Sequence, residues 1–276
     1  MKTYQESIGK KGQVSYYIQE NSEKNPLLII LPGGAYAVTS HREGQPVAEA
    51  FYQEGYSTIV LDYSTEGVEG ELIDNPVSKF PQPLLEVATL FKQVHQQADH
   101  LGIDPHDVTL IGFSAGANLA CQFAVYAKEA WLQKAVHAQI EDLSFQQLIL
   151  AYPPLNEEGI MQGRNALYYQ MALGTSQPTQ EEINLISPLN KVDQSMPPTF
   201  IWTTGEDRLV DPINSLQLAT RLHELRVPFE LHLFQPGEHG LSLATPDIAK
   251  RPSQIQDHVA QWFPLAVSWL KEVRKA

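Results

Sequence analysis

The segment from Val108 to Ala120 constrains the fold more than any other part of the chain. It starts as a β-branched and apolar run, passes through Gly-Phe-Ser-Ala-Gly at 112–116, and continues in small apolar residues. The first part is typical of a buried strand, and the last part is typical of a tightly packed helix. The sequence therefore predicts a strand, a sharp turn and a helix, with Ser114 at the tip of the turn.

Ser114 is the candidate nucleophile. A serine in such a turn adopts a strained backbone conformation, and Gly112 and Gly116 leave room for the neighbouring strand and helix. The Ala115 amide then lies at a helix N-terminus, where unpaired N–H groups and the helix dipole favour a developing negative charge. Gly-x-Ser-x-Gly also occurs in ordinary turns, so the interpretation depends on the strand and the helix around it.

Strand and helix patterns alternate along the chain. Apolar runs predict strands at 27–31, 57–63, 148–152, 199–205 and 229–234, after an antiparallel pair at 3–9 and 13–19. Helical spacing predicts helices at 47–52, 84–101, 211–225 and 259–273. This alternation indicates an α/β fold with a mostly parallel sheet and helices on both faces. We expect one domain over 1–276, with 156–198 as a small helical cap inserted in it.

Composition narrows the classes of partner. A net charge of −13 argues against nucleic acid and anionic membranes, because both bind clustered Lys and Arg. No apolar run approaches the roughly 20 residues of a membrane-spanning helix, and 1–20 lack a signal-peptide core. We therefore expect a soluble, cytoplasmic protein that acts on a small molecule; self-association into a homo-oligomer is left open. The single cysteine, Cys121, cannot form an internal disulfide.

The loops that follow parallel strands converge on one crevice, so distant residues can meet there. A serine needs a base within hydrogen-bond reach, and the base needs a partner that fixes its tautomer. His239 follows the last strand between Gly237 and Gly240, whereas the other histidines fall in helices, a strand or polar segments. Asp207 directly follows the strand at 199–205 and is the expected acid, with Glu206 as the substitute.

Asp211 also follows that strand, but it precedes Pro212 and has a sufficient role as a helix N-cap. The glycine-rich exit at 32–36 can supply backbone amides to an oxyanion, and we favour those of Gly34 and Ala35 together with Ala115. Which amide of 33–35 serves is left open. Side chains that could line the pocket are Tyr36, His41, Tyr152, Tyr168 and Tyr169.

At these motifs the chain resembles the bacterial acetyl esterase and acetyl xylan esterase-like carboxylesterases, relatives of the hormone-sensitive lipase group. The likeness runs from about Leu27 to the C-terminus. It implies an α/β-hydrolase fold, Ser114 as nucleophile, Asp207 as acid and His239 as base, in the chain order Ser, Asp, His. It also implies small acyl esters, no cofactor and no metal. The chain departs from the group at Pro32, where His is common, and at Ala35, where a third Gly is common.

The sequence thus predicts a serine carboxylesterase for acetyl to butyryl esters. Alternatives are a deacetylase for acetylated saccharides of the xylan type, a serine peptidase, and a non-catalytic small-molecule binding protein on a hydrolase fold. Peptidases with this residue order usually carry a propeller domain, for which 276 residues leave no room. A binding protein would be expected to lack a member of the triad.

Overall fold

A central sheet organises the computed structural model, which describes residues 1–21, 23–67, 73–157 and 165–275. Within these residues, eight strands form one sheet in the order β1-β2-β4-β3-β5-β6-β7-β8. The strands are β1 (Lys2–Ile8), β2 (Gly12–Ile18), β3 (Asn25–Leu31), β4 (Ser57–Asp62), β5 (Ile103–Phe113), β6 (Gln147–Ala151), β7 (Thr199–Thr204) and β8 (Phe229–Phe234). β2 pairs antiparallel with both neighbours, and every other pair is parallel. The expected mostly parallel sheet is confirmed.

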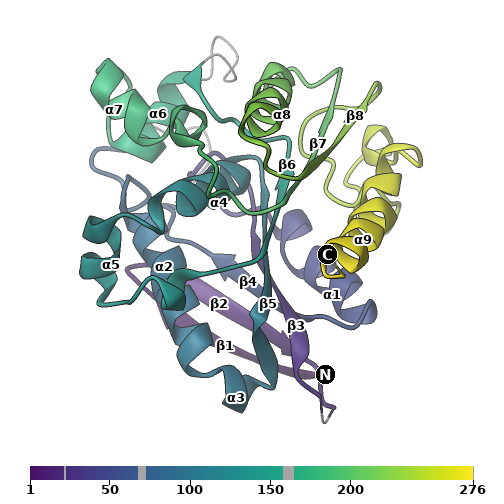
Figure 1. Ribbon diagram of the computed structural model, residues 1–276. Coiled ribbons are helices and arrows are strands. Elements are labelled where there is room, and N and C mark those ends of the chain that lie inside the picture. Colours follow the sequence, from purple (N-terminus) through teal and green to yellow (C-terminus); the bar gives the residue numbers. More distant parts are fainter. Residues whose placement is uncertain (22, 68–72, 158–164, 276) are drawn as a thin grey trace.

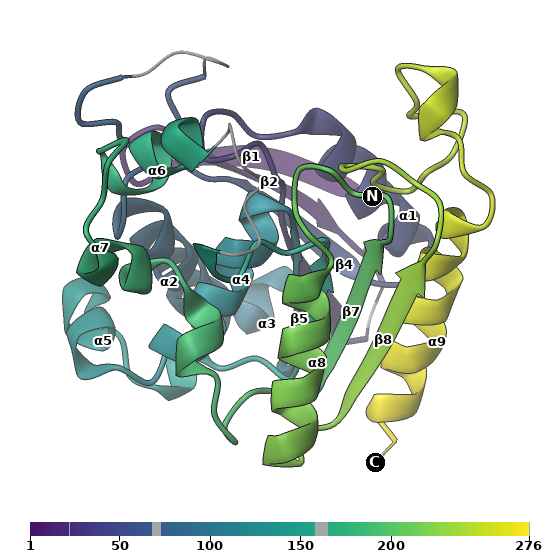
Figure 2. The same cartoon turned by 90° about the horizontal axis from the view of Figure 1, so that it is seen from above.

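Helices cover both faces of this sheet, as Figures 1 and 2 show. One face carries α1 (Gln45–Gln53) and α9 (Trp262–Val273), and the other carries α2 (Gln82–Gln96), α3 (Ala98–Leu101), α4 (Ala115–Tyr126), α5 (Ala130–Val136) and α8 (Ile213–Leu225). Side chains of a strand alternate between the two faces because the pleat has a period of two residues. In β3, accordingly, Leu27, Ile29 and Leu31 join one core, and Leu28 and Ile30 join the other.

Short helices complete the chain. They are η1 (His41–Glu43), η2 (Glu141–Leu143), α6 (Asn165–Leu173), α7 (Gln180–Leu185), η4 (Pro188–Lys191), η5 (Pro252–Gln254) and η6 (Val259–Gln261). α6, α7 and η4 occupy the region expected to be a helical cap, of which residues 158–164 lie outside the described part. None of the helices in the described ranges is both long enough and apolar enough to cross a membrane.

Two expected helices begin or end differently in the structure. The segment 84–101 is not one helix, because α2 ends at Gln96 and its C-cap, Gln97, has a φ of −107° and a ψ of 10° that interrupt the helix before α3. The apolar spacing continues through Ala98 and Leu101, which are both buried, and so gives no sign of the break. At the other position, α8 begins at Ile213 and its N-cap is Pro212. The predictions that Asp211 is the N-cap and that Pro212 is the first helical residue are therefore both wrong by one position.

Candidate active site

Ser114 lies in the turn between β5 and α4, as the sequence predicts. Its φ of 50° and ψ of −118° fall in a region that L residues rarely adopt, and such strain costs about 1–3 kcal/mol. The turn needs glycine on both sides: a Cβ on Gly116 would lie 2.0 Å from the Leu31 carbonyl oxygen, and one on Gly112 would lie 2.3 Å from that of Gly116. Close packing against β3 and α4 therefore requires these two glycines.

The three expected catalytic side chains meet at the carboxyl ends of β5, β7 and β8. Ser114 Oγ lies 2.8 Å from His239 Nε2, and His239 Nδ1 lies 2.6 Å from Asp207 Oδ2. An ionised carboxylate only accepts, so this contact places the ring proton on Nδ1 and leaves Nε2 to accept the Ser114 hydroxyl proton. This is the relation that activates a serine.

Asp207 is held in place by its own loop. Its Oδ1 accepts hydrogen bonds from the amides of Leu209, at 2.9 Å, and Val210, at 3.0 Å, and its carboxyl group is fully buried. Asp211 does not reach this site; its Oδ1 accepts from the Ile213 amide at 2.9 Å, at the start of α8. Glu206 accepts from the Gly237 amide at 3.4 Å instead of from the histidine. The geometry therefore separates the three acidic residues that the sequence left in competition.

The glycine turn packs directly against the serine. A Cβ on Gly33 would lie 2.8 Å from Ser114 Cβ, and the next three residues, Gly34, Ala35 and Tyr36, have φ values of 129°, 54° and 63°. The Gly33 amide donates to the Glu43 carboxylate at 2.9 Å. Within the described residues, by contrast, the amides of Gly34, Ala35 and Ala115 donate no hydrogen bond, which leaves them available to an oxygen next to Ser114.

The residues expected to line a pocket lie at different depths. Tyr36 is buried behind the turn, and its hydroxyl donates to Asn118 Oδ1 at 2.8 Å. Tyr152 is buried beneath His239, with the two ring centroids 4.9 Å apart. Tyr168 and Tyr169 of α6 are more than nine-tenths buried, whereas His41 at the start of η1 is exposed. Their contact with a substrate stays a prediction.

Sequence reasoning missed two residues of η1. Glu43 is 3% exposed and joins the glycine turn to Tyr152, while the Arg42 guanidinium binds the carbonyl oxygens of Gly240 at 2.8 Å, Leu241 at 3.2 Å and Ile248 at 2.9 Å. Both lie in a polar stretch with no recognisable spacing. Only their positions nine and ten residues after Gly33 could have drawn attention to them.

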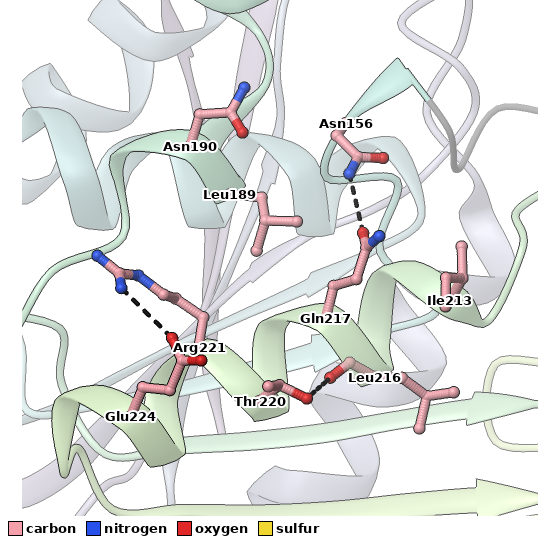
Figure 3. Close-up of a pocket in the computed structure, with 9 residues that line it drawn as sticks. All are labelled: Asn156, Leu189, Asn190, Ile213, Leu216, Gln217, Thr220, Arg221 and Glu224. Atoms are coloured by element: carbon pink, nitrogen blue, oxygen red, sulfur yellow. Dashed lines mark hydrogen bonds and ion pairs between the residues drawn. The ribbon is translucent and has the colours of Figure 1, made fainter.

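Two hollows lie on the surface of the described residues. A cleft of about 790 Å³ is lined by Asp207 and His239 together with charged residues of both loops, namely Glu206, Arg208, Glu238 and Arg251. A groove of about 560 Å³ runs between η4 and α8, where Ile213 and Leu216 are exposed. Figure 3 shows its lining residues, including the Arg221–Glu224 pair at 3.5 Å. No triad residue lines this groove. Asp207 and His239 line the first hollow, whereas Ser114 and the glycine turn do not.

The sequence matches a known protein family over most of its length. Residues 15–222 match the BD-FAE family. Among curated relatives, endo-1,4-beta-xylanase B of Butyrivibrio fibrisolvens is 30% identical over 87% of this chain and 36% of its own length. The acetylxylan esterase of Xylanibacter ruminicola is 23% identical over 92% of this chain and 48% of its own length. The chain thus spans less than half the length of these relatives.

Solved structures match nearly the whole chain. A sugar hydrolase from Lactococcus lactis is 30% identical, with a TM-score of 0.80 and 99% of both chains covered. The carboxylesterase Cest-2923 from Lactobacillus plantarum is 26% identical, with a TM-score of 0.84, and covers 99% of this chain and 98% of its own. The resemblance read from the sequence is confirmed, and a carboxylesterase is among the matching structures. The chain belongs to the BD-FAE family and has the α/β-hydrolase fold.

Proposed function

We propose that the protein is a serine carboxylesterase that hydrolyses short-chain acyl esters through Ser114, His239 and Asp207. The observation that carries this proposal is the pair of distances at His239, 2.8 Å from its Nε2 to Ser114 Oγ and 2.6 Å from its Nδ1 to Asp207 Oδ2. Each distance is that of a hydrogen bond. The two bonds connect the three side chains in the order that lets a histidine accept the proton of a serine hydroxyl.

The reaction proceeds in two halves. Ser114 Oγ bonds to the ester carbonyl carbon while its proton passes to His239 Nε2, and the carbonyl oxygen becomes an oxyanion. Collapse of this intermediate breaks the bond to the alcohol oxygen, which takes the proton from His239 and leaves an acyl-Ser114. Water then adds to the acyl carbon as His239 accepts its proton. The bond from the acyl carbon to Ser114 Oγ breaks, Oγ takes the proton back from His239, and the acid is released. Asp207 keeps the ring oriented and stabilises its charged form.

The oxyanion is stabilised by backbone amides. Ala115 contributes the amide at the start of α4, and the glycine turn contributes Gly34 or Ala35, since the Gly33 amide is engaged by Glu43. Removing one such donor costs about 3–4 kcal/mol in other enzymes. Because these donors are backbone groups, the conformation of the turn is as important as the identity of its side chains.

Acyl size is limited by aromatic bulk behind the turn. The ring centroids of Tyr36 and Tyr168 lie 5.8 Å apart, and both side chains are at least nine-tenths buried. They fill the space between the glycine turn and α6, which we propose to be part of a small cap within a single domain. In an open groove each further methylene would add about 0.8 kcal/mol of binding. In this site the gain in binding free energy ends once the acyl chain contacts Tyr36 and Tyr168.

A series of p-nitrophenyl esters from acetyl to decanoyl tests this proposal. We expect the highest kcat/KM between acetyl and butyryl and a fall by octanoyl. A kcat/KM that keeps rising to decanoyl would contradict the short-chain assignment without affecting the triad, for which Ser114→Ala is the control.

Acetylated saccharides are the second candidate substrate. One relative is an acetylxylan esterase, and short acyl groups suit the same site. Acetate release from acetylated xylo-oligosaccharides, compared with p-nitrophenyl acetate at equal concentration, distinguishes a saccharide deacetylase from a general esterase. A deacetylase would prefer the saccharide in kcat/KM.

A further inference from the structure

Glu43 is a buried carboxylate beside the site that the proposed reaction does not use. It ends η1, and each of its two oxygens has a separate partner: Oε2 accepts from the Gly33 amide at 2.9 Å, and Oε1 accepts from the Tyr152 hydroxyl at 2.6 Å. Burying a carboxylate is costly unless its oxygens are hydrogen-bonded, so both contacts are needed. One side chain therefore connects two loops that are more than a hundred residues apart in the sequence.

The first contact holds the strained turn. Ala35 and Tyr36 both have left-handed backbone, which costs an L residue about 1–2 kcal/mol. The turn must be held by its surroundings, and Gly33, its first residue, is fixed at both polar groups: its amide by Glu43 and its carbonyl oxygen by the Ser40 amide at 2.9 Å. A shift of Gly33 would move the amides that follow it, next to Ser114.

The second contact supports the base. Burial, with the Glu43 carboxylate nearby, raises the pKa of Tyr152 well above its usual range, so its hydroxyl keeps its proton and donates a hydrogen bond to Glu43. The same hydroxyl oxygen accepts from the Ser242 amide at 3.2 Å, three residues after His239. The Tyr152 ring packs edge-on against the imidazole, with centroids 4.9 Å apart. The position of Tyr152 therefore determines where the His239 ring packs.

We propose that Glu43 is a positioning residue that sets the oxyanion turn and the catalytic histidine relative to each other. This inference rests on the proposed function of Ser114 and His239. Arg42 acts in the same direction, since its guanidinium binds two carbonyl oxygens directly after His239, those of Gly240 and Leu241. η1 is therefore hydrogen-bonded both to the glycine turn, through Glu43, and to the loop that carries His239, through Arg42.

Glu43→Gln tests the inference because it preserves the shape of the side chain. The amide can accept from only one of its two partners, so one loop loses its fixed acceptor. We expect kcat to fall by about tenfold or more, with KM within about twofold, because oxyanion and base geometry act in the transition state. The rate of phosphonylation by a fluorophosphonate should fall by a similar factor.

Glu86→Gln is the matched control. Glu86 is also a buried carboxylate, 1% exposed, and accepts from the amides of Ser64 at 2.7 Å and Lys10 at 3.2 Å. It has no contact with the triad or with Gly33 among the described residues. Its variant should lower the Tm to a similar degree and leave kcat within about twofold of the wild type.

Tyr152→Phe provides a second variant in case Glu43→Gln folds poorly. It removes only the hydroxyl between Glu43 and Ser242 and should lower kcat by a smaller factor. If the two residues act through one connection, the double variant lowers kcat no further than Glu43→Gln alone. Fully multiplicative losses would contradict a shared path.

The outcomes separate this inference from the proposed function. A Glu43→Gln kcat within twofold of the wild type overturns the positioning role, as does an equal loss of kcat in Glu86→Gln at the same loss of Tm. Turnover retained by Ser114→Ala overturns the proposed function itself. Loss of turnover in Ser114→Ala, with a normal kcat in Glu43→Gln, refutes only the inference.

Discussion

Most non-glycine residues with left-handed backbone fall into two groups that differ in what holds them. The first group lies in loops at the carboxyl edge of the sheet, around the triad: Ala35, Tyr36, Ser114, Tyr152, Ser242 and Ala244. The second group, His137 and Arg226, ends α5 and α8. Helix ends adopt this conformation through local hydrogen bonds, and both residues bond back to their own helices.

Residues of the carboxyl-edge group also have local backbone hydrogen bonds, as from the Ala244 amide to the Leu241 carbonyl oxygen. In addition, contacts between distant segments hold members of this group, such as Tyr36 with Asn118 and Tyr152 with Glu43. Strain that persists only because the surroundings impose it is typical of functional sites. The strained residues at the carboxyl edge therefore surround the proposed catalytic site, whereas those at the helix ends terminate helices.

His239→Ala should have the largest effect at the carboxyl edge. Without the base, Ser114 is a poor nucleophile, and kcat/KM should fall by about 10³–10⁴-fold. Steady-state hydrolysis of p-nitrophenyl acetate measures this loss. His106→Ala, an exposed histidine in β5, is the control and should keep normal turnover. Near-normal turnover in His239→Ala would assign the base to another residue.

Substitution of the two aspartates after β7 should affect different properties, kcat for Asp207 and stability for Asp211. Asp207→Ala should lower kcat by about 10³-fold or more, because the histidine loses the partner that fixes its tautomer. Asp211→Ala removes the acceptor of the Ile213 amide and should cost about 1 kcal/mol of unfolding free energy with kcat nearly unchanged. Parallel kinetics and thermal unfolding test the pair, and an exchange of the two phenotypes would exchange their roles.

Two substitutions to glycine, one in each group of left-handed residues, are expected to have the smallest effects. Arg226→Gly relieves left-handed backbone at the exposed end of α8 and should stabilise the protein by about 0.5–1 kcal/mol with no change in kcat. Ala35→Gly should stabilise by a similar amount but lower kcat severalfold, because the oxyanion turn gains freedom. Equal kcat in both variants would show that the Ala35 conformation has no catalytic role.

The sequence alone predicted the parts of the molecule that depend on local pattern. Apolar runs located the strands, and Gly-Phe-Ser-Ala-Gly located the turn at Ser114. Asp207 and His239 could be chosen because each directly follows a strand, and parallel strands bring such loops together. The broken helix at Gln97 was missed, since the apolar spacing continues across the break into α3.

The supporting residues could not be predicted in this way. Glu43 and Tyr152 are 109 residues apart, and the hydrogen bond between them follows from the packing of η1 against the loop after β6. Neither residue type, nor spacing, nor charge marks such a pair in one sequence. The same holds for Arg42, whose partners are backbone carbonyl oxygens about 200 residues away.

The most direct test of the account is covalent labelling of Ser114. The wild-type protein is treated with a fluorophosphonate, and the product is examined by intact-protein mass and peptide mapping. The account predicts one phosphonyl group per chain, located on Ser114, and no labelling of a folded Ser114→Ala variant. Labelling retained in that variant, or mapped to another residue, would contradict it.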